Sequence, residues 1–241
     1  MNNLFILSGM FLLLTVLTTS LNLSAQTIYG NGNVSEENRT LSSFDEIESD
    51  GVMNVFLKQG GTESVTIKGD KNILPYIETK VTDRRLVISV KKGITLKDSH
   101  KLSVYVTLKD LTALRNNGVG NLRSENKLDL NDLKIINNGV GNIDLEFDCN
   151  RLDLEINSVG NNTFSGNADI VDILHNGVGN LNAFDLTADK LKIVSNSVGN
   201  ADVRSEREID ITLNGTGNVF YKGSASIKRS EKNGIGNIKK M

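Results

Sequence analysis

The sequence is poor in the residues from which most active sites are built. Its 241 residues include one cysteine, two histidines and no tryptophan. With only Cys149, His100 and His175, the chain cannot supply a zinc site of ordinary ligand spacing. A lone cysteine cannot form an intrachain disulfide, and no serine lies in a G-x-S-x-G motif. We therefore predict no catalytic, metal-binding or cofactor-binding residues, and no cofactor.

The sequence also lacks a dominant charge. It contains 27 Lys and Arg against 29 Asp and Glu, for a net charge of −2 at pH 7. Nucleic-acid binding needs a basic face, so nucleic acid is not an expected partner, and neither is an anionic membrane surface. Tryptophan is absent and the four tyrosines are scattered along the chain. Sugar binding by aromatic stacking is therefore not expected.

The chain opens with an uncharged, apolar segment. No charge occurs from Leu4 to Leu23, and small residues precede Gln26. We interpret residues 1–25 as a secretory signal peptide cleaved near Ala25. The alternative is an uncleaved anchor, since about 20 apolar residues span a bilayer. Either way we expect export to the periplasm, the outer-membrane surface or the extracellular space, with membrane contact only through this segment.

A five-residue phrase, Asn-Gly-Val-Gly-Asn, recurs with small changes through the second half of the chain. Its seven copies begin 18 to 21 residues apart. A period of this length is typical of a solenoid, in which each repeat packs on its neighbours. The copies begin at Asn117, Asn138, Asn157, Asn176, Asn196, Asn214 and Asn233.

One repeat illustrates the expected coil. Apolar and acidic residues alternate over 143–148 and again over 152–156, with a corner at Asn150-Arg151 between them. Alternation places one face in a core and the other in water, so each repeat is predicted to contain two short strands and two turns. Stacked as coils of an all-β parallel β-helix, equivalent residues lie about 4.8 Å apart. We expect Ile170 and Ile173 to stack on the apolar residues of 152–156.

The glycines and asparagines of the phrase have separate expected roles. Only glycine easily adopts positive φ or allows close backbone approach at a tight corner. The second glycine is present in every copy, whereas Ser158 and Ser197 replace the first. Asparagine amides can form hydrogen-bonded ladders from coil to coil. The predicted structural positions are Gly120, Asn121, Gly141, Asn142, Gly160, Asn161, Gly179, Asn180, Gly199, Asn200, Gly217, Asn218, Gly236 and Asn237.

The chain before the repeat is predicted to be continuous with the stack. We treat residues 44–238 as one domain, with less regular strands over 44–110 and regular coils over 111–238. Residues 26–43 are expected to form a loosely ordered polar lead-in, and 50–54 looks like a degraded copy of the phrase. The pattern predicts strands over 64–68, 85–90 and 102–108, a short helical turn or crossover over 73–80, and a charged loop over 91–101.

Few side chains are candidates for chemistry. Parity along the strand places Cys149 inward, where it is expected to act as a small buried apolar residue. We interpret His100 and His175 as solvated or edge histidines. Calcium-binding β-rolls are disfavoured because their period is half as long and the phrase has a neutral Asn where they have an Asp ligand.

Several stretches outside the phrase carry a family resemblance. They are FDEI at 44–47, GVMNVFLKQG at 51–60, VTIKGDKN at 65–72, LVI at 86–88 and GNVFYKG at 217–223. Together with the repeated Gly-Val-Gly-Asn, they resemble the head GIN domain of autotransporter adhesins, a family of exported Bacteroidetes proteins, over about residues 44–238. The resemblance implies a right-handed parallel β-helix and an adhesin-like role. It carries over no catalytic or ligand residue.

Three functions are open at this point. The first is a non-enzymatic envelope or surface module that binds a protein or glycan along a flat face of the rod. The second is a structural protein that self-associates into a homo-oligomer. The third is a lyase-like, carbohydrate-active β-helix enzyme that uses Asp144, Asp148 and Arg151, although interspersed charge is ordinary on such surfaces. We favour the first and do not expect an enzyme.

Overall fold

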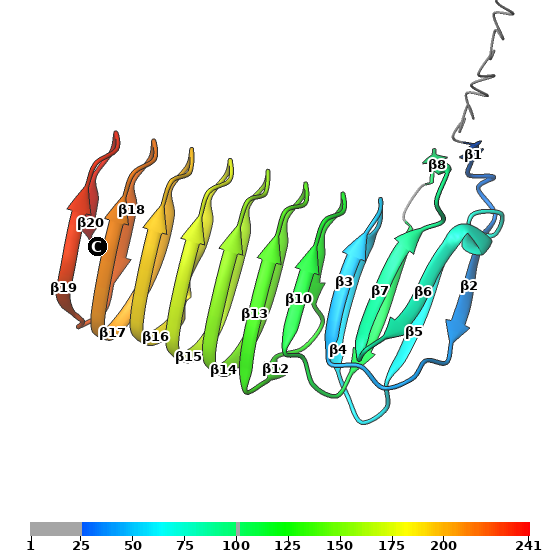
Figure 1. Cartoon of the computed structure of the whole chain (residues 1–241), viewed down its shortest axis with the longest axis horizontal. Helices are drawn as coiled ribbons and strands as arrows, with labels where there is room; N and C mark the ends of the chain where they lie inside the picture. Colours follow the sequence, from blue (N-terminus) through cyan, green and yellow to red (C-terminus); the bar gives the residue numbers. More distant parts are fainter. Residues whose placement is uncertain (1–25, 100–101) are drawn as a thin grey trace, which may run out of the picture.

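The chain forms a straight rod of stacked coils (Figure 1). The computed structural model describes residues 26–99 and 102–241. The predicted signal segment, 1–25, and His100 lie outside the described residues. The fold is all-β and is a right-handed parallel β-helix with a strand-rich N-terminal part, so the fold prediction is confirmed. Within the described residues, no helix is long and apolar enough to cross a membrane.

The strands fall into two groups. The N-terminal part contains β1 (Gln26–Tyr29), β2 (Val34–Arg39), β3 (Glu46–Asp50), β4 (Asn54–Gln59), β5 (Ser64–Asp70), the short 3-10 helix η1 (Leu74–Tyr76), β6 (Ile77–Thr82), β7 (Arg85–Val90), β8 (Ile94–Lys97) and β9 (Ser103–Leu108). The coils contain β10 (Ala113–Asn116), β11 (Leu122–Ser124), β12 (Leu128–Asp129), β13 (Asp132–Asn137), β14 (Ile143–Ile156), β15 (Asn162–His175), β16 (Leu181–Ser195), β17 (Ala201–Leu213), β18 (Val219–Lys222), β19 (Ser226–Lys232) and β20 (Ile238–Lys240).

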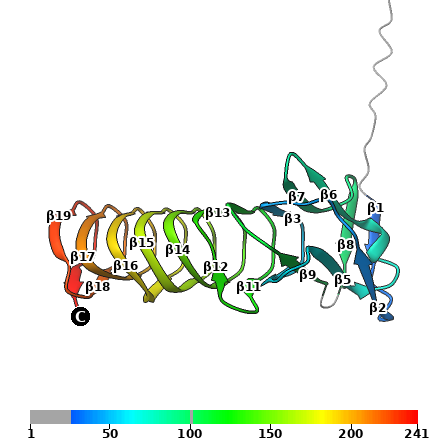
Figure 2. The ribbon, with the colours of Figure 1, turned by 90° about the horizontal axis from the view of Figure 1, so that it is seen from below.

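Two sheets face each other across the core (Figure 2). Sheet A runs through β6, β7, β3, β10 and β13, then the second halves of β14 to β17, and ends at β19. Sheet B runs through β2, β5, β9, β4 and β11, then the first halves of β14 to β17, and ends at β18 and β20. The phrases form the turn edge where each coil passes from sheet A back to sheet B.

The strands of the regular coils are longer than predicted. We expected two short strands per repeat, but β14 is one strand of 14 residues and passes the corner without a shift in its register with β15. At the corner the alternation of buried and exposed side chains shifts by one residue, because two consecutive residues, Asn150 and Arg151, are not buried. Backbone pairing with the coils on either side holds the strand through the bend, so a separate turn is not needed.

Inward side chains stack in rows along the axis. Leu152 pairs with Val171, and Leu154 pairs with Ile173; all four side chains are buried. The predicted place of Ile170 in this core row is wrong, because Ile170 pairs with Arg151 at the corner and is 39% exposed. The parity shift at the corner moves the inward position from Ile170 to Val171.

The N-terminal part is more ordered than the sequence suggested. Within the predicted lead-in, β2 pairs antiparallel with β5, and β1 pairs with β8 inside the predicted 91–101 loop. Both expectations are wrong for the same reason: these are edge strands, whose polar side chains can remain exposed while the backbone bonds to a neighbour. The strand predictions for 64–68, 85–90 and 102–108 are confirmed. The helical turn predicted around Pro75 is the short 3-10 helix η1, which lies at the start of the predicted 73–80 segment.

Candidate binding surfaces

The turn edge requires glycine at its second glycine position. At Gly179 φ is +132°, and an added Cβ would lie 2.1 Å from the carbonyl oxygen of Gly160 in the preceding coil. A side chain would therefore force neighbouring coils apart. The other predicted glycines occupy the equivalent position with positive φ: Gly120, Gly141, Gly160, Gly199, Gly217 and Gly236.

Two rows of asparagine run along this edge. In the outer row, formed by the first asparagine of each phrase, the Asn176 side-chain amide donates to Oδ1 of Asn157 at 2.8 Å, and the same bond links all seven members. In the inner row, formed by the last asparagine, the backbone N–H of Asn180 donates to Oδ1 of Asn161 at 3.1 Å. The inner row consists of Asn54, Asn121, Asn142, Asn161, Asn180, Asn200, Asn218 and Asn237.

Residues 50–54 form the first rung of this edge, as the sequence suggested. Val52 makes a parallel bridge with Val119, and Oδ1 of Asn54 accepts a hydrogen bond from the backbone N–H of Asn121 at 2.9 Å. The edge therefore has eight rungs rather than the seven that carry the full phrase.

A group of polar side chains is buried just inside the edge. Asn137 donates to Oδ1 of Asn162 at 2.7 Å, and Nδ1 of His175 lies 3.0 Å from Oγ of Ser197. His175 is only 1% exposed, so its interpretation as a solvated or edge residue is wrong. Burial lowers the pKa of His175 to about 4. The residue directly before a phrase is buried in six of the seven copies, all but the last, and that offset was the available signal.

Cys149 lies in the core, as predicted, and its side chain is buried. Burial, with smaller contributions from the nearby carboxylates of Asp132, Asp148 and Asp169, raises the pKa of the Cys149 thiol to about 12. The reactive form of cysteine is the thiolate. At neutral pH this buried thiol is therefore protonated in the folded protein.

The structure does not bring together the three residues considered for a lyase-like cluster. Asp148 forms an ion pair with Lys127 and accepts hydrogen bonds from Asn167. Arg151 lies beyond the corner on sheet A, where it contacts two other carboxylates, and Asp144 lies on sheet B. Within residues 26–99 and 102–241, no group of three His, Cys, Asp or Glu side chains could hold a metal ion.

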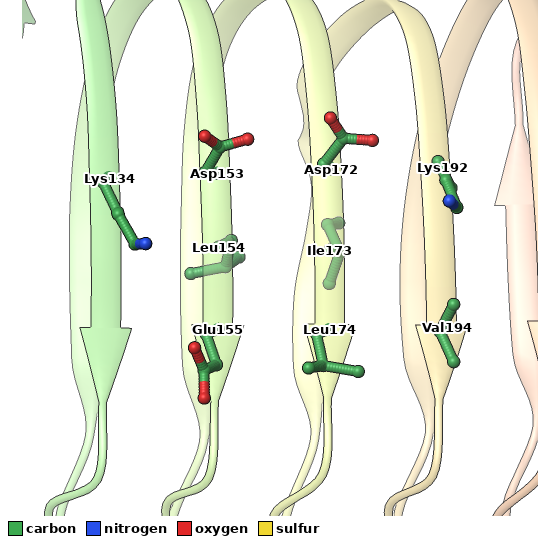
Figure 3. Close-up of a pocket in the computed structure, with 9 residues that line it drawn as sticks. All are labelled: Lys134, Asp153, Leu154, Glu155, Asp172, Ile173, Leu174, Lys192 and Val194. Atoms are coloured by element: carbon green, nitrogen blue, oxygen red, sulfur yellow. The ribbon is translucent and has the colours of Figure 1, made fainter.

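The outer face of sheet A carries a shallow depression of about 380 Å³. Lys134, Asp153, Asp172 and Lys192 cross it on four successive strands, β13 to β16 (Figure 3). Arg151 at the corner contacts both aspartates, at 3.0 Å from Asp153 and still closer to Asp172. The row therefore carries charges in the order plus, minus, minus, plus, with both aspartates held by Arg151.

An apolar row lies beside the charged row. Leu174 and Val194 point outward next to Glu155 (Figure 3), and Leu174 is 38% exposed. The sequence contained a signal for both rows. Each charged residue lies four positions before a phrase, and each member of the second row lies two positions before it. Aligning the repeats would have placed the residues together, which reading a single repeat did not.

The sequence matches a known domain family over residues 43–225. The family is described as "Putative auto-transporter adhesin, head GIN domain". The chain belongs to this family. The family resemblance expected from the sequence is thus confirmed. No curated protein matches this GIN domain.

Solved structures share the fold of this GIN domain. A "putative adhesin" from Bacteroides fragilis is 30% identical, with a TM-score of 0.86 over 89% of this chain and 100% of the other. A "putative lipid binding protein" from Parabacteroides distasonis is 23% identical, with a TM-score of 0.70 over the same shares. A "putative adhesin" from Parabacteroides merdae is also 23% identical, with a TM-score of 0.64, again over 89% of this chain and 100% of the other.

Proposed function

We propose that this GIN domain is an exported, non-enzymatic binding module that docks a protein partner on the outer face of sheet A. The observation that carries the proposal is the pair of rows described above. Charges of both signs lie beside outward aliphatic side chains on one face of the sheet. Family membership supports an adhesin-like role, and the uncharged segment at 1–25 supports export.

The chemistry of the described residues supports binding rather than catalysis. Asp153 and Asp172 both contact Arg151, so neither is a free carboxylate poised to transfer a proton. The thiol of Cys149 and the imidazole of His175 are buried away from the surface. The depression on sheet A combines charge with exposed apolar atoms and therefore has the character of a contact surface.

The row supports a protein partner over a glycan. Lys134 and Lys192 flank the two aspartates, so a partner that matches the row must carry charges of both signs at defined spacing. Proteins supply such patterns, and they also bury aliphatic groups such as Leu174. No aromatic ring lines the depression, so a sugar ring has no platform on which to stack.

The proposal can be tested with residues 26–241 labelled and applied in parallel to an array of cell-surface proteins and an array of glycans. We expect protein targets whose signal falls at least tenfold for Leu174→Lys and Asp172→Lys, which disturb sheet A. Glu146→Lys makes the same charge change on sheet B and should keep full signal. Protein targets whose signal is unchanged by the sheet A variants would refute the proposal, and so would signals confined to the glycan array.

A further inference from the structure

A row of apolar side chains projects along the turn edge. We call it the valine ridge; it consists of Val52, Val119, Val140, Val159, Val178, Val198, Thr216 and Ile235, joined in order by parallel bridges. The six valines are 48–57% exposed and Ile235 is 77% exposed. Seven of the eight positions hold a large β-branched apolar side chain that faces solvent.

The fold does not require the exposed side chains of the ridge to be apolar. Thr216 occupies the same place, with the same bridges to both neighbours, so a polar β-branched residue is tolerated there. An outward row elsewhere on the rod can be charged, as the Lys134 to Lys192 row on sheet A illustrates. Burial in the monomer therefore does not account for the valines.

The flanks of the ridge are neutral, and the side-chain amides of the outer row are already hydrogen-bonded to one another. The outer asparagine row lies on one side and the inner row on the other, and neither carries charge. The Asn157 amide, for example, donates to Asn138 at 2.9 Å and accepts from Asn176 at 2.8 Å. Covering the outer row would therefore leave its side-chain amides paired, and removing a polar group from water without a partner is the main cost of burial.

We propose that the valine ridge is the interface for a second copy of this chain, packed antiparallel and ridge against ridge about a two-fold axis. The side chains recur about every 4.8 Å, and a second copy has the same repeat, so the two rows can interdigitate over their full length. A two-fold axis makes such a contact closed and self-complementary. The uncharged strip excludes the repulsion that the charged rows of sheet A would create.

The size of the ridge sets the strength of this contact. Eight rungs span roughly 34 Å, which makes the strip an apolar patch of a few hundred Å². Both partners together bury less than the roughly 1,200–2,000 Å² of a stable complex. The dimer is therefore weak in dilute solution and forms where chains are concentrated, as two copies held on one surface would be.

Sedimentation equilibrium of residues 26–241 across a concentration series tests the proposal. We expect a monomer–dimer equilibrium whose association constant falls at least tenfold in Val159→Thr/Val178→Thr, a change that the chain already accommodates at Thr216. The matched control is Leu174→Thr, on the outer face of sheet A, which should dimerise like the parent. Unchanged melting temperatures establish that the variants are folded.

Cross-linking tests the orientation. In the fully overlapped antiparallel dimer Val159 faces Val178 of the second copy, so mixing Val159→Cys with Val178→Cys should give more disulfide-linked dimer than Val159→Cys alone. The buried Cys149 does not compete. A strictly monomeric protein, or a dimer insensitive to the threonine changes, would overturn the proposal. A monomer that binds neutral phosphatidylcholine vesicles through the valines would also overturn it and assign the ridge to lipid.

This inference concerns a different surface from the proposed partner site on sheet A. Loss of dimerisation in the valine variants with full binding on the protein array would separate the two. Loss of array binding in Leu174→Lys with unchanged dimerisation would separate them in the other direction.

Discussion

Nδ1 of His175 lies 3.0 Å from Oγ of Ser197 in the following phrase, and both side chains are buried. Ser197 is one of two serines that replace the first glycine of the phrase. In the equivalent place at Gly139, an added Cβ would lie 2.4 Å from the side-chain amide nitrogen of Asn116. The serine therefore accompanies a change in the buried polar group beside it and is not a random variant of the phrase.

Ser197→Gly should destabilise the protein by about 1–3 kcal/mol, because it leaves a buried imidazole nitrogen without its partner. Urea unfolding at pH 7 measures the change. A double-mutant cycle with His175→Leu isolates the contact, since Ser197→Gly should cost less once the imidazole is gone. Equal costs in the two backgrounds would show that the contact contributes nothing.

Stability should fall with pH below the ordinary histidine range. The pKa of His175 is about 4 in the folded protein against an ordinary value of about 6.5, so only the unfolded chain takes up a proton between these values. Above pH 6.5 this histidine adds no pH dependence, and from 6.5 down to 4 it destabilises the fold progressively, by about 3 kcal/mol in total. Urea unfolding from pH 7 to 4.5 should show this loss in the parent and a smaller one in His175→Leu. Parallel curves would contradict it.

Gly179→Val should destabilise the whole stack. The backbone at Gly179 has φ of +132°, and the new side chain would collide with the carbonyl oxygen of Gly160. We expect a loss of several kcal/mol, typical of strain combined with steric overlap, and a clearly lower melting temperature. The neighbouring change Val178→Thr should melt like the parent. A mutant with the melting temperature of the parent would show that the coils can separate without cost.

Cys149 should not react with thiol reagents in the native protein. Its pKa of about 12 leaves almost no thiolate at pH 8, and its side chain is buried. Reaction with a disulfide reagent should therefore proceed only at the rate of unfolding and become immediate in urea. Rapid labelling without denaturant would place the thiol at the surface.

The coils were predictable because one physical rule repeats. The period of the phrase fixes the length of each coil, and parity within the coil fixes which side chains enter the core. The prediction failed where the rule is interrupted, at Ile170, because a corner shifts parity by one residue. It also failed for β2, which has no apolar face and owes its order to backbone bonds with β5.

The candidate site was less accessible to sequence reasoning. The rows through Lys134 and Leu174 are formed by residues about 20 positions apart, which come together only when the coils are aligned by their phrases. Even then, the contact between Arg151 and Asp172 depends on how a side chain turns at the corner. Pattern reading gives the position of a residue but not the direction in which a long side chain extends.

The outer asparagine ladder has a direction. Each side-chain amide donates toward the N-terminal end of the rod, from Asn233 back to Asn117, and the last donor meets the carboxylate of Glu48 at 3.3 Å. Dipoles aligned head to tail add together, as they do in a helix, and bonds in such a chain polarise one another. The rod is therefore electrically polar along its edge despite its neutral surface there, with a carboxylate at the positive end. Two copies packed antiparallel would align these dipoles in opposition, so each would cancel the field of the other.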